Sequence, residues 1–508
     1  MLAKLISGCI DGLEAYRVDV EVSIQKVGVE SRWFTVGLPD TAVKESQQRV
    51  RVAIGNCGYY IPNKTITVNL GPGNLRKEGP YFDLPIAVGI LSASDQIPAR
   101  LFQQYFILGE LSLEGHVRPI PGVLAMAMLA RRLGIRNLLV PRENAHEAAM
   151  LEGIDVYGIG SLVEAVEFLN TGNGIPRTPS VPFAEAGAAA HGIDFAEVKG
   201  QFHARRALEV AAAGGHNVLM IGPPGAGKTL LAQRIPTILP PLTFEESLES
   251  TKIYSVAGQL RGGGLLRTRP FRAPHHTVSY AGLVGGGANP LPGEISLAHH
   301  GVLFLDELPE FGKVILETLR QPLENGTIRI SRASGSVEFP CRFMLVAAMN
   351  PCPCGYYGSS DHACKCSALQ LQRYLTRISG PLLDRFDIHL DVPPVKPQEL
   401  LIENFEAEPS ACIRERVVRA RNLQIARYRE SRLFSNSQLP AKWIKQYCRL
   451  DASCLELMEK AIRKYKLSAR AYHRILKVSR TIADLDAAKE IAPHHLAEAI
   501  QYRSLDQY

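Results

Sequence analysis

The stretch GPPGAGKT at residues 222–229 decides the fold of the region around it. It follows an apolar run at 217–221 and precedes LLAQR at 230–234, which is typical of a helix start. It matches G-x-x-x-x-G-K-[ST], in which glycines let the backbone turn tightly and direct successive N–H groups at phosphate oxygens. We expect Lys228 to reach the β- and γ-phosphates of a nucleotide and Thr229 to bind Mg²⁺. The predicted nucleotide-binding residues are Gly222, Pro223, Pro224, Gly225, Ala226, Gly227, Lys228 and Thr229.

Two later apolar runs end in polar side chains that suit the same nucleotide. The run GVLFLDEL at 301–308 contains Asp306 and Glu307, and the run at 344–349 leads to Asn350. We expect Asp306 to hold Mg²⁺ through water, Glu307 to polarise the attacking water, and Asn350 to sense the γ-phosphate. An isolated Asp-Glu pair is more often a solvated turn, but its position downstream of a phosphate loop favours the catalytic interpretation. The pattern predicts an ATPase that uses ATP and Mg²⁺.

Two arginines farther along the chain have more than one interpretation. Arg385 lies in GPLLDRFDIHL at 380–390, and Arg470 lies in SARAYHR at 468–474. Arg385 suits a buried salt-bridge partner, or, in a ring of subunits, a charge that acts on the γ-phosphate of the neighbouring subunit. Arg470 offers a second charge for the same phosphate. The residues alone leave these interpretations open.

The composition is that of a globular protein with several domains. Of the 508 residues, 46% are apolar and 21% are charged, and the chain is too long for one core. No apolar run approaches the roughly 18 residues of a membrane span, and residues 1–12 do not resemble a signal peptide. We therefore expect a cytoplasmic protein with reduced thiols and no membrane partner.

The formal net charge of +7 is unevenly distributed. Residues 414–480 hold 18 Lys and Arg against 5 Asp and Glu, a local net charge of +13. Such a region can meet the phosphates of a nucleic acid. It can equally form a solvated helical surface or face the nucleotide of a neighbouring subunit, and the charge alone favours neither interpretation.

The pattern along the chain divides it into three parts and a linker. Residues 1–170 alternate strand-like and helical stretches, and residues 171–190 are rich in Gly, Pro and Ala without periodicity, as in a linker. A second α/β unit spans 191–395, and residues 396–508 are helical in pattern. The fold class is therefore α/β with a helical C-terminal domain.

Four of the ten cysteines lie in the loop 350–367, as two Cys-x-Cys pairs. The ligands Cys352, Cys354, Cys364 and Cys366 suit a tetrahedral structural Zn²⁺, which would close a loop with few apolar residues. A disulfide is disfavoured in a reducing compartment, and a redox switch needs only two cysteines. Paired histidines at 275–276, 299–300 and 494–495 are interpreted as capping or packing residues and not as metal ligands.

With these motifs, the chain resembles AAA+ ATPases of the Mg-chelatase and minichromosome-maintenance branch, and most closely the ComM (YifB) family. Beyond the ATPase motifs, the resemblance rests on DFAEVKGQ at 194–201, AAAGGHN at 211–217, FRAPHHT at 271–277 and the cysteine loop. It implies a central P-loop AAA+ domain with β-hairpin insertions and a C-terminal helical lid. It further implies a homohexamer that uses ATP to drive branch migration of recombination intermediates during natural transformation, with single-stranded, duplex and branched DNA as its partners.

The resemblance also assigns two segments to the pore of such a ring. Residues 327–339 alternate on both sides of a turn at 333–335, which predicts a hairpin with Arg332 near its tip. There Arg332 would contact the DNA backbone, whereas otherwise it is an ordinary solvated side chain. The Gly- and Arg-rich residues 261–287 occupy the place of a second insertion, which we expect to be a mobile pore element.

The N-terminal region resembles the proteolytic domain of Lon, an S5-type α/β domain, most clearly at 107–124 and 138–144. Lon uses a Ser–Lys dyad, in which the lysine is the base for the serine. The matching positions hold Tyr81 and Leu124, and a leucine cannot accept a proton. We therefore expect residues 1–170 to form a Lon-like domain without proteolytic activity.

Two other functions remain as alternatives. A Mg-chelatase-type ATPase subunit shares the ATPase core, but its resemblance covers mainly that core. An AAA+ protein unfoldase would need no Ser–Lys dyad. Stimulation of the ATPase by DNA would favour a DNA motor over both alternatives.

Overall fold

The computed structural model describes residues 2–25, 32–98, 104–180, 183, 192–260, 264–287, 290–332, 335–358, 362–395, 407–431 and 433–503. The chain forms two compact units. Unit 1 comprises Met1–Gly187, Phe244–Leu266 and Ala288–Pro292, and unit 2 comprises Ala188–Thr243, Arg267–Gly287 and Gly293–Tyr508. None of the helices in these described ranges has the length and apolar character needed to cross a membrane.

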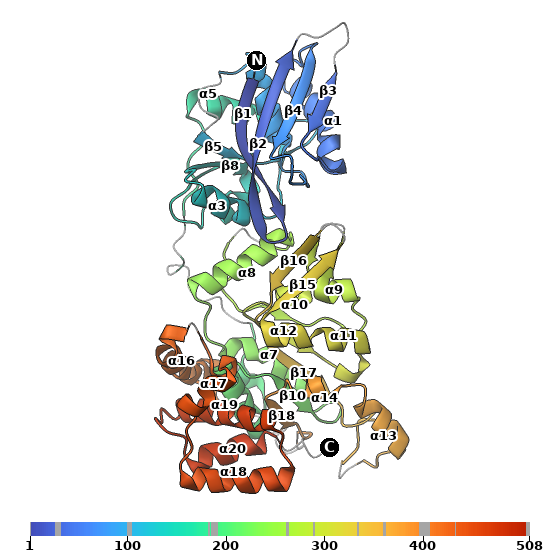
Figure 1. Cartoon of the computed structure of the whole chain (residues 1–508), viewed down its shortest axis with the longest axis vertical. Helices are drawn as coiled ribbons and strands as arrows, with labels where there is room; N and C mark the ends of the chain where they lie inside the picture. Colours follow the sequence, from blue (N-terminus) through green and yellow to red (C-terminus); the bar gives the residue numbers. More distant parts are fainter. Residues whose placement is uncertain are drawn as a thin grey trace. The chain divides into compact units, whose positions relative to one another are not determined.

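Unit 1 is built on a seven-stranded mixed sheet in the order β3-β4-β2-β1-β5-β8-β9 (Figure 1). Its strands are β1 (Leu2–Asp11), β2 (Glu14–Gln25), β3 (Trp33–Val36), β4 (Thr65–Gly71), β5 (Tyr105–Ile107), β8 (Asn137–Pro141) and β9 (Asp155–Ile159). Every second residue of β2 from Val18 to Ile24 is buried, so one face of the hairpin β1–β2 covers the core. The short strands are β6 (Glu110–Leu111), β7 (Val117–Arg118) and β13 (Leu291–Pro292).

The helices of unit 1 include one from a distant part of the sequence. They are α1 (Thr41–Asn56), α2 (Asp83–Ala93), α3 (Val123–Arg132), α4 (Ala145–Ala148), α5 (Leu162–Thr171) and α8 (Phe244–Val256), with the 3₁₀ turn η2 (Arg142–Asn144). Asp40 caps α1 by accepting a 2.7 Å hydrogen bond from the Val43 N–H. Helix α8 packs against α3, so residues 244–266 leave unit 2 in sequence and fold with unit 1.

Unit 2 holds a five-stranded parallel sheet in the order β11-β14-β17-β10-β18. The strands are β10 (Val218–Ile221), β11 (Phe271–Arg272), β14 (Val302–Leu305), β17 (Met344–Met349) and β18 (Ile388–Asp391). β14 and β17 are buried along their whole length, as expected for strands covered on both faces. β15 (Thr327–Arg332) and β16 (Gly335–Pro340) form a separate antiparallel hairpin, and β12 spans Gly285–Gly286.

The helices of unit 2 flank this sheet and form the C-terminal region (Figure 1). They are α6 (Phe202–Gly214), α7 (Lys228–Ile238), α9 (Tyr280–Val284), α10 (Glu294–Leu297), α11 (Lys313–Thr318), α12 (Arg320–Asn325), α13 (Ala368–Leu375), α14 (Gly380–Leu383), α16 (Ser410–Arg427), α17 (Ala441–Tyr447), α18 (Ala452–Tyr465), α19 (Ala469–Leu485) and α20 (Pro493–Gln501), with the 3₁₀ turns η3 (Phe195–Glu197), η4 (Leu308–Glu310), η5 (Arg429–Ser431) and η6 (Asn436–Gln438). Helices α16 and α19 pack on α6, and apolar residues of the sheet and the C-terminal helices share one core. The expected α/β fold class with a helical C-terminal region is confirmed.

The structure corrects the interpretation of residues 261–287 as one mobile element. Phe271 and Arg272 form β11, which pairs in parallel with Val302 and Leu303 of β14. A strand that completes the central sheet is held by backbone hydrogen bonds. Of the predicted linker 171–190, residues 181–182 and 184–190 lie outside the described residues.

Candidate nucleotide-binding site

The loop 222–227 connects β10 to α7 at the carboxyl edge of the parallel sheet. Gly225 and Gly227 have φ angles of +78° and +87°, which favour glycine, and α7 begins at Lys228. A Cβ on Gly222 would lie 2.1 Å from the carbonyl oxygen of Val392, so the loop passes close to the end of β18. The glycines thus give the loop the tight path that the sequence motif predicts.

Lys228 lies at the centre of the site with only 8% of its surface exposed. Its Nζ donates to the carbonyl oxygens of Gly222 and Pro223, at 2.6 and 2.9 Å, and to Asn350 Oδ1 at 3.1 Å. Burial lowers the pKa of Lys228, and the nearby carboxylates of Asp306 and Glu307 act in the opposite direction. A buried ammonium of this kind gains from an anionic ligand.

Asp306 and Glu307 follow β14 and face the start of α7. The Thr229 hydroxyl donates to Asp306 Oδ2 at 2.7 Å, which brings the two oxygens predicted to bind Mg²⁺ within reach of one ion. Glu307 has a φ of +52°, a left-handed conformation that costs a non-glycine residue about 1–2 kcal/mol. Its N–H donates to Asp306 Oδ1 at 2.9 Å.

A histidine that sequence analysis interpreted as a packing residue contacts the predicted catalytic carboxylate. His276 Nδ1 lies 3.4 Å from Glu307 Oε2, and the imidazole also packs edge-on against Phe311. The position of His276 soon after β11, next to β14 in the sheet, is the signal that could have indicated this contact. The other pairs fit the packing or capping interpretation: His299 Nδ1 accepts the Arg342 N–H, and His495 Nδ1 accepts the Ala492 N–H, both at 2.9 Å.

The strand order explains why these side chains meet. β10 lies between β17 and β18, and β14 lies beside β17, so Asn350 at the end of β17 comes between Lys228 and Asp306. All four strands run in parallel, and their carboxyl ends therefore share one edge. Lys228, Thr229, Asp306, Glu307 and Asn350 are brought together as the sequence predicts.

Arg385 and Arg470 have partners of their own. Arg385 is 8% exposed, pairs with Glu324 and donates to the Pro381 carbonyl at 2.7 Å. Arg470 is exposed and pairs with Asp384 Oδ2 at 3.3 Å. Burial and the charges of Arg320, Arg474 and Arg470 lower the pKa of Arg385, so both arginines belong to one positively charged cluster.

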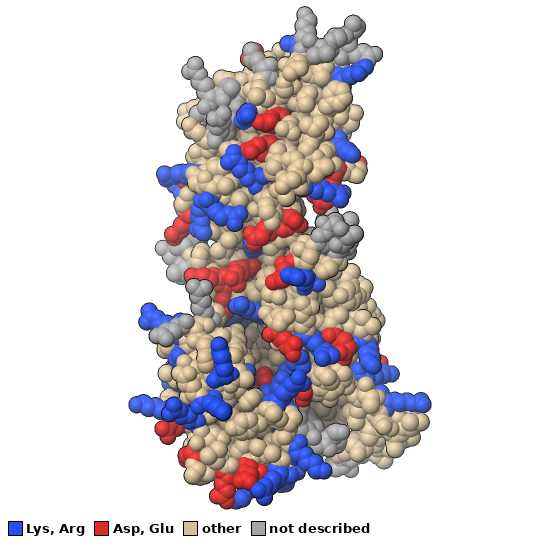
Figure 2. Space-filling model, viewed as in Figure 1, with Lys and Arg blue, Asp and Glu red and all other residues tan. Residues whose placement is uncertain are grey.

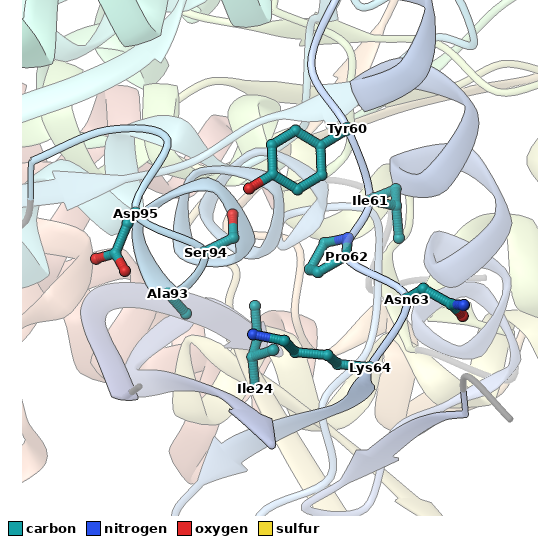
Figure 3. A pocket seen from close by; sticks show the side chains of 9 residues that line it. All are labelled: Ile24, Tyr60, Ile61, Pro62, Asn63, Lys64, Ala93, Ser94 and Asp95. Carbon is teal, nitrogen blue, oxygen red and sulfur yellow. The ribbon is translucent and has the colours of Figure 1, made fainter. Parts of the chain in front are cut away.

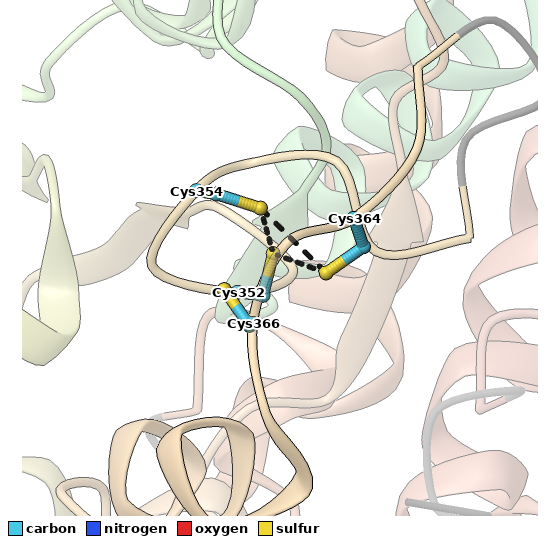
Figure 4. A group of neighbouring side chains, drawn as sticks. All are labelled: Cys352, Cys354, Cys364 and Cys366. Atoms are coloured by element: carbon cyan, nitrogen blue, oxygen red, sulfur yellow. Dashed lines mark hydrogen bonds between the residues drawn. The ribbon is translucent and has the colours of Figure 1, made fainter.

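The four loop cysteines converge as the sequence predicts (Figure 4). Their Sγ atoms all lie within 4.8 Å of one another, with Cys352 at 3.3 Å from Cys354 and 3.7 Å from Cys364. Tetrahedral Zn²⁺ with Zn–S bonds of about 2.3 Å would place sulfurs about 3.8 Å apart, which fits this donor set. Backbone N–H groups of Tyr356 and Lys365 lower the pKa of Cys354 to about 6, whereas burial and hydrogen bonds with the neighbouring thiols raise the pKa of Cys364 and of Cys366.

The predicted hairpin at 327–339 forms, and its strands pair from Thr327–Pro340 to Arg332–Gly335. Residues 333–334 and the side chain of Arg332 lie outside what the structure describes. The backbone of Arg332 is the last of β15 before the turn. Its role at the tip stays a prediction.

Carboxylates from outside the basic region 414–480 pair with five of its 18 Lys and Arg residues. The pairs are Arg416 with Glu209 and Glu408, Arg427 and Arg480 with Asp484, Arg470 with Asp384, and Arg474 with Asp387. Figure 2 shows Lys and Arg interspersed with Asp and Glu on the visible face of unit 2. The local charge of +13 therefore overstates the free positive charge of this surface.

In unit 1, the positions that correspond to the Lon dyad are buried. Tyr81 is 7% exposed and Leu124 is fully buried, and burial raises the pKa of the Tyr81 hydroxyl strongly. The N–H of Leu124 donates to the buried Glu147 at 2.8 Å. Tyr81 and Leu124 thus belong to the hydrophobic core of unit 1.

A pocket of about 520 Å³ also belongs to unit 1 (Figure 3). Its walls are Ile24, residues 60–64 and residues 93–95. The Ser94 hydroxyl donates to the Ile90 carbonyl at 2.8 Å, and the Tyr60 N–H donates to Gln96 Oε1 at 3.0 Å. The Ser94 hydroxyl and the Tyr60 N–H thus form hydrogen bonds within the protein. Around Lys228, by contrast, several polar side chains converge on one point.

Comparison with known families matches three consecutive parts of the chain. Residues 194–400 match the family described as magnesium chelatase, subunit ChlI. Residues 20–144 match the family described as subunit ChlI of Mg-chelatase. Residues 407–503 match the family described as magnesium chelatase, subunit ChlI C-terminal. The first match contains the whole nucleotide-binding site and the cysteine loop.

Individual relatives extend the similarity to the full chain. Competence protein ComM of Haemophilus influenzae is 44% identical over 506 residues, covering 99% of this chain and 98% of that protein. YifB of Escherichia coli is 44% identical over 98% of this chain and 96% of its own length. Lon protease 2 of Bacillus subtilis is 28% identical over 141 residues, 28% of this chain and 24% of that protein. Together with the convergent nucleotide site, this similarity shows that the chain belongs to the ComM and YifB family of Mg-chelatase-like AAA+ proteins, whose N-terminal region is related to Lon.

Proposed function

We propose that the chain is an ATP-driven DNA motor that assembles as a homohexamer and promotes branch migration of recombination intermediates. Its substrates would be single-stranded, duplex and branched DNA, during integration of incoming DNA in natural transformation. Similarity over 99% of the chain to a protein named for competence supports this process. The observation that carries the energy-coupling part is the convergence of Lys228, Thr229, Asp306 and Asn350.

Each residue of the site has a role in this proposal. Lys228 binds the β- and γ-phosphates, where the anion restores the charge that burial disfavours. Thr229 and Asp306 hold Mg²⁺, which neutralises the developing charge, and Glu307 orients and polarises the attacking water. Asn350 contacts the γ-phosphate and reports its presence to β17.

Arg385 and Arg470 act on the nucleotide of the neighbouring subunit. They lie in one positively charged cluster, and their present partners, Glu324 and Asp384, are carboxylates that a phosphate can replace. A site completed in trans makes hydrolysis depend on ring assembly. We therefore assign these arginines to the interface between subunits.

The remaining assignments concern DNA, zinc and the domains. Arg332, at the end of β15, contacts the DNA backbone in the pore, because a phosphate contact requires a positive tip and not base-reading chemistry. Cys352, Cys354, Cys364 and Cys366 bind a structural Zn²⁺. Residues 1–170 form a non-proteolytic Lon-like domain, 191–395 the AAA+ domain, of which residues 244–266 and 288–292 fold with unit 1, and 396–508 the helical lid.

The test is the ATPase rate of the full chain with single-stranded, duplex and four-way-junction DNA at low salt. We expect stimulation by DNA, together with movement of the junction. If no DNA binds or stimulates at low salt, the motor function is wrong. Stimulation by a porphyrin with partner subunits would indicate a chelatase instead, and stimulation by unfolded protein would indicate an unfoldase.

A matched pair of variants ties the motor to its site. Glu307→Gln should abolish hydrolysis and junction movement while nucleotide binding remains, because the carboxylate acts on water. Glu310→Gln, three residues later in the turn η4, changes a carboxylate that pairs with Arg377 at the surface and should keep both activities. Equal losses in the two variants would contradict the assignment of Glu307.

A further inference from the structure

The loop that carries the four cysteines begins at Asn350 of the nucleotide site and leads into helix α13, which returns towards that residue. It leaves β17 at Asn350, whose Oδ1 accepts the hydrogen bond from Lys228 at 3.1 Å. It ends at Ser367, which caps α13 by accepting the Gln370 N–H at 3.3 Å. Helix α13 then carries Tyr374 back, so that the buried Tyr374 hydroxyl faces the backbone N–H of Asn350.

The thiols join these two ends of the loop. Cys352 and Cys354 belong to the end near Asn350, and Cys364 and Cys366 belong to the end near α13. Across the loop, Cys364 Sγ lies 3.7 Å from Cys352 and 3.6 Å from Cys354 (Figure 4). One ion bound by all four sulfurs would therefore hold the two ends of the loop together next to Asn350. The loop is too short to form an apolar core that could hold them instead.

The inner turn of the loop also touches the phosphate-binding loop. The Gly355 N–H donates to the Cys352 carbonyl at 2.9 Å, which closes a turn in which Gly355 has a φ of +87°. A Cβ on Gly355 would lie 2.5 Å from Cδ and 2.8 Å from Cγ of Pro224. The cysteine loop thus packs directly against Pro224, beside the loop glycine Gly225.

We propose that Zn²⁺ bound by the four cysteines is a structural part of the nucleotide site and sets its affinity for ATP. The metal holds the Gly355 turn against Pro224 and keeps Asn350 between Lys228 and Tyr374. This inference rests on the proposed nucleotide binding, and it assigns Gly355 and Tyr374 as positioning residues.

The physical reason is preorganisation. A phosphate cradle of backbone N–H groups binds well only if its loop is held in the binding conformation before the nucleotide arrives. Four thiolates fill the coordination sphere of Zn²⁺, so the metal acts by position and not by activating water. Loss of the metal frees both ends of the loop, and Asn350 and Pro224 lose their support together.

The chain offers a matched pair of glycines for the test. Gly358 lies in the same loop with a φ of +78°, but a Cβ there would meet nothing within 4 Å. Gly355→Ala and Gly358→Ala therefore share the cost of a left-handed alanine, and Gly355→Ala alone forces Pro224 to move. Their effects on nucleotide binding isolate the contact with the phosphate-binding loop.

The dissociation constant of a fluorescent ATP analogue is measured for the full-length chain and its variants, alongside zinc content and thermal unfolding. We expect one Zn²⁺ per chain in Gly358→Ala, with an affinity within about twofold of wild type. In Gly355→Ala the dissociation constant should rise roughly tenfold or more, because small displacements at such sites are costly. An unchanged constant in Gly355→Ala, or an equal rise in Gly358→Ala, overturns the proposal.

A second arm removes the metal. The double variant Cys364→Ser with Cys366→Ser should lose the absorption of a Co²⁺–thiolate centre when the chain is loaded with Co²⁺, and its dissociation constant should rise as in Gly355→Ala. A metal-free variant that binds nucleotide as tightly as wild type overturns the proposal. If the wild type itself binds no nucleotide, the proposed ATPase function fails instead, so the two failures are distinguishable.

Discussion

Lys228 of unit 2 and Lys77 of unit 1 are both buried, and each donates to carbonyls of its own loop. The partners of Lys228 are Gly222 and Pro223, and those of Lys77 are Pro72 and Leu75. Burial lowers the pKa of both lysines. The local surroundings of the two ammonium groups are therefore alike.

The two lysines differ in the side chains that surround their ammonium groups. Around Lys228, two further strands deliver Asp306, Glu307 and Asn350. The titratable neighbour that acts on Lys77 is the thiol of Cys9, whose own pKa burial raises to about 11, so that it carries no charge near neutral pH. A buried lysine in a tight loop does not by itself make a reactive site, and the convergence of several strand ends does.

The sharpest test of this comparison replaces each lysine with methionine, which keeps the length of the side chain. Lys228→Met should lower the ATPase rate by at least about a hundredfold, because it removes the charge that binds the phosphates. Lys77→Met should leave the rate within about twofold. The rates of both variants are measured in a steady-state ATPase assay. An equal loss in Lys77→Met would contradict the conclusion that only Lys228 serves the ATPase.

A second prediction concerns the polar groups buried in unit 1. Glu147 accepts hydrogen bonds from the Leu124 N–H at 2.8 Å, from Asn144 at 3.2 Å and from Ser255. Glu147→Ala leaves these donors unpaired and should lower the free energy of unfolding by about 2–3 kcal/mol. In denaturant unfolding, the exposed neighbour Glu143→Ala serves as control, with less than about 0.5 kcal/mol expected.

A third, smaller effect is the pH dependence that Lys77 imposes. Its folded pKa lies below the ordinary value of 10.5, so between these two values the unfolded chain holds a proton that the folded chain has lost. Stability from this group therefore rises with pH across that window. Denaturant unfolding at about pH 7 and about pH 10 should show a larger rise for wild type than for Lys77→Met. Parallel pH profiles would contradict the shift.

The smallest expected effect is that of Tyr81→Phe. The ring packs in the core, and Tyr81 is the residue that the resemblance aligns with the Lon nucleophile, so the change keeps the packing and removes the candidate nucleophile. We expect ATPase and junction movement within about twofold of wild type and a stability change below about 1 kcal/mol. Loss of activity in a folded Tyr81→Phe protein would show that unit 1 has chemistry of its own.

Sequence analysis could predict the nucleotide site because its information is local. Lys228, Thr229, Asp306, Glu307 and Asn350 lie within a few residues after the end of a strand, and parallel strands end at a common edge. The same holds for the cysteines, since the two Cys-x-Cys pairs are separated by only nine residues. In both cases short stretches of chain already restrict where the side chains can lie.

The contacts that sequence analysis missed join side chains from separate elements. His276 reaches Glu307 because β11 lies beside β14, and the carboxylates of Glu209 and Asp484 reach arginines of α16 because the helices pack there. Helix α8 folds with unit 1 although its sequence lies between α7 and β11. Apart from the position of His276 soon after a strand, linear patterns carry no signal for these pairings, because the pairings depend on which surfaces meet.

The sequence by itself determined the α/β class, the glycine-rich loop 222–227 and the identity of the residues that converge on Lys228. Spacing of apolar runs, glycines and carboxylates is enough for these features, because backbone geometry is a local property. Only the tertiary structure showed that Gly355 packs against Pro224 and that Tyr374 faces Asn350. It also showed that Tyr81 and Lys77 are buried. Those features depend on packing between distant segments, where a few tenths of an ångström separate contact from clash.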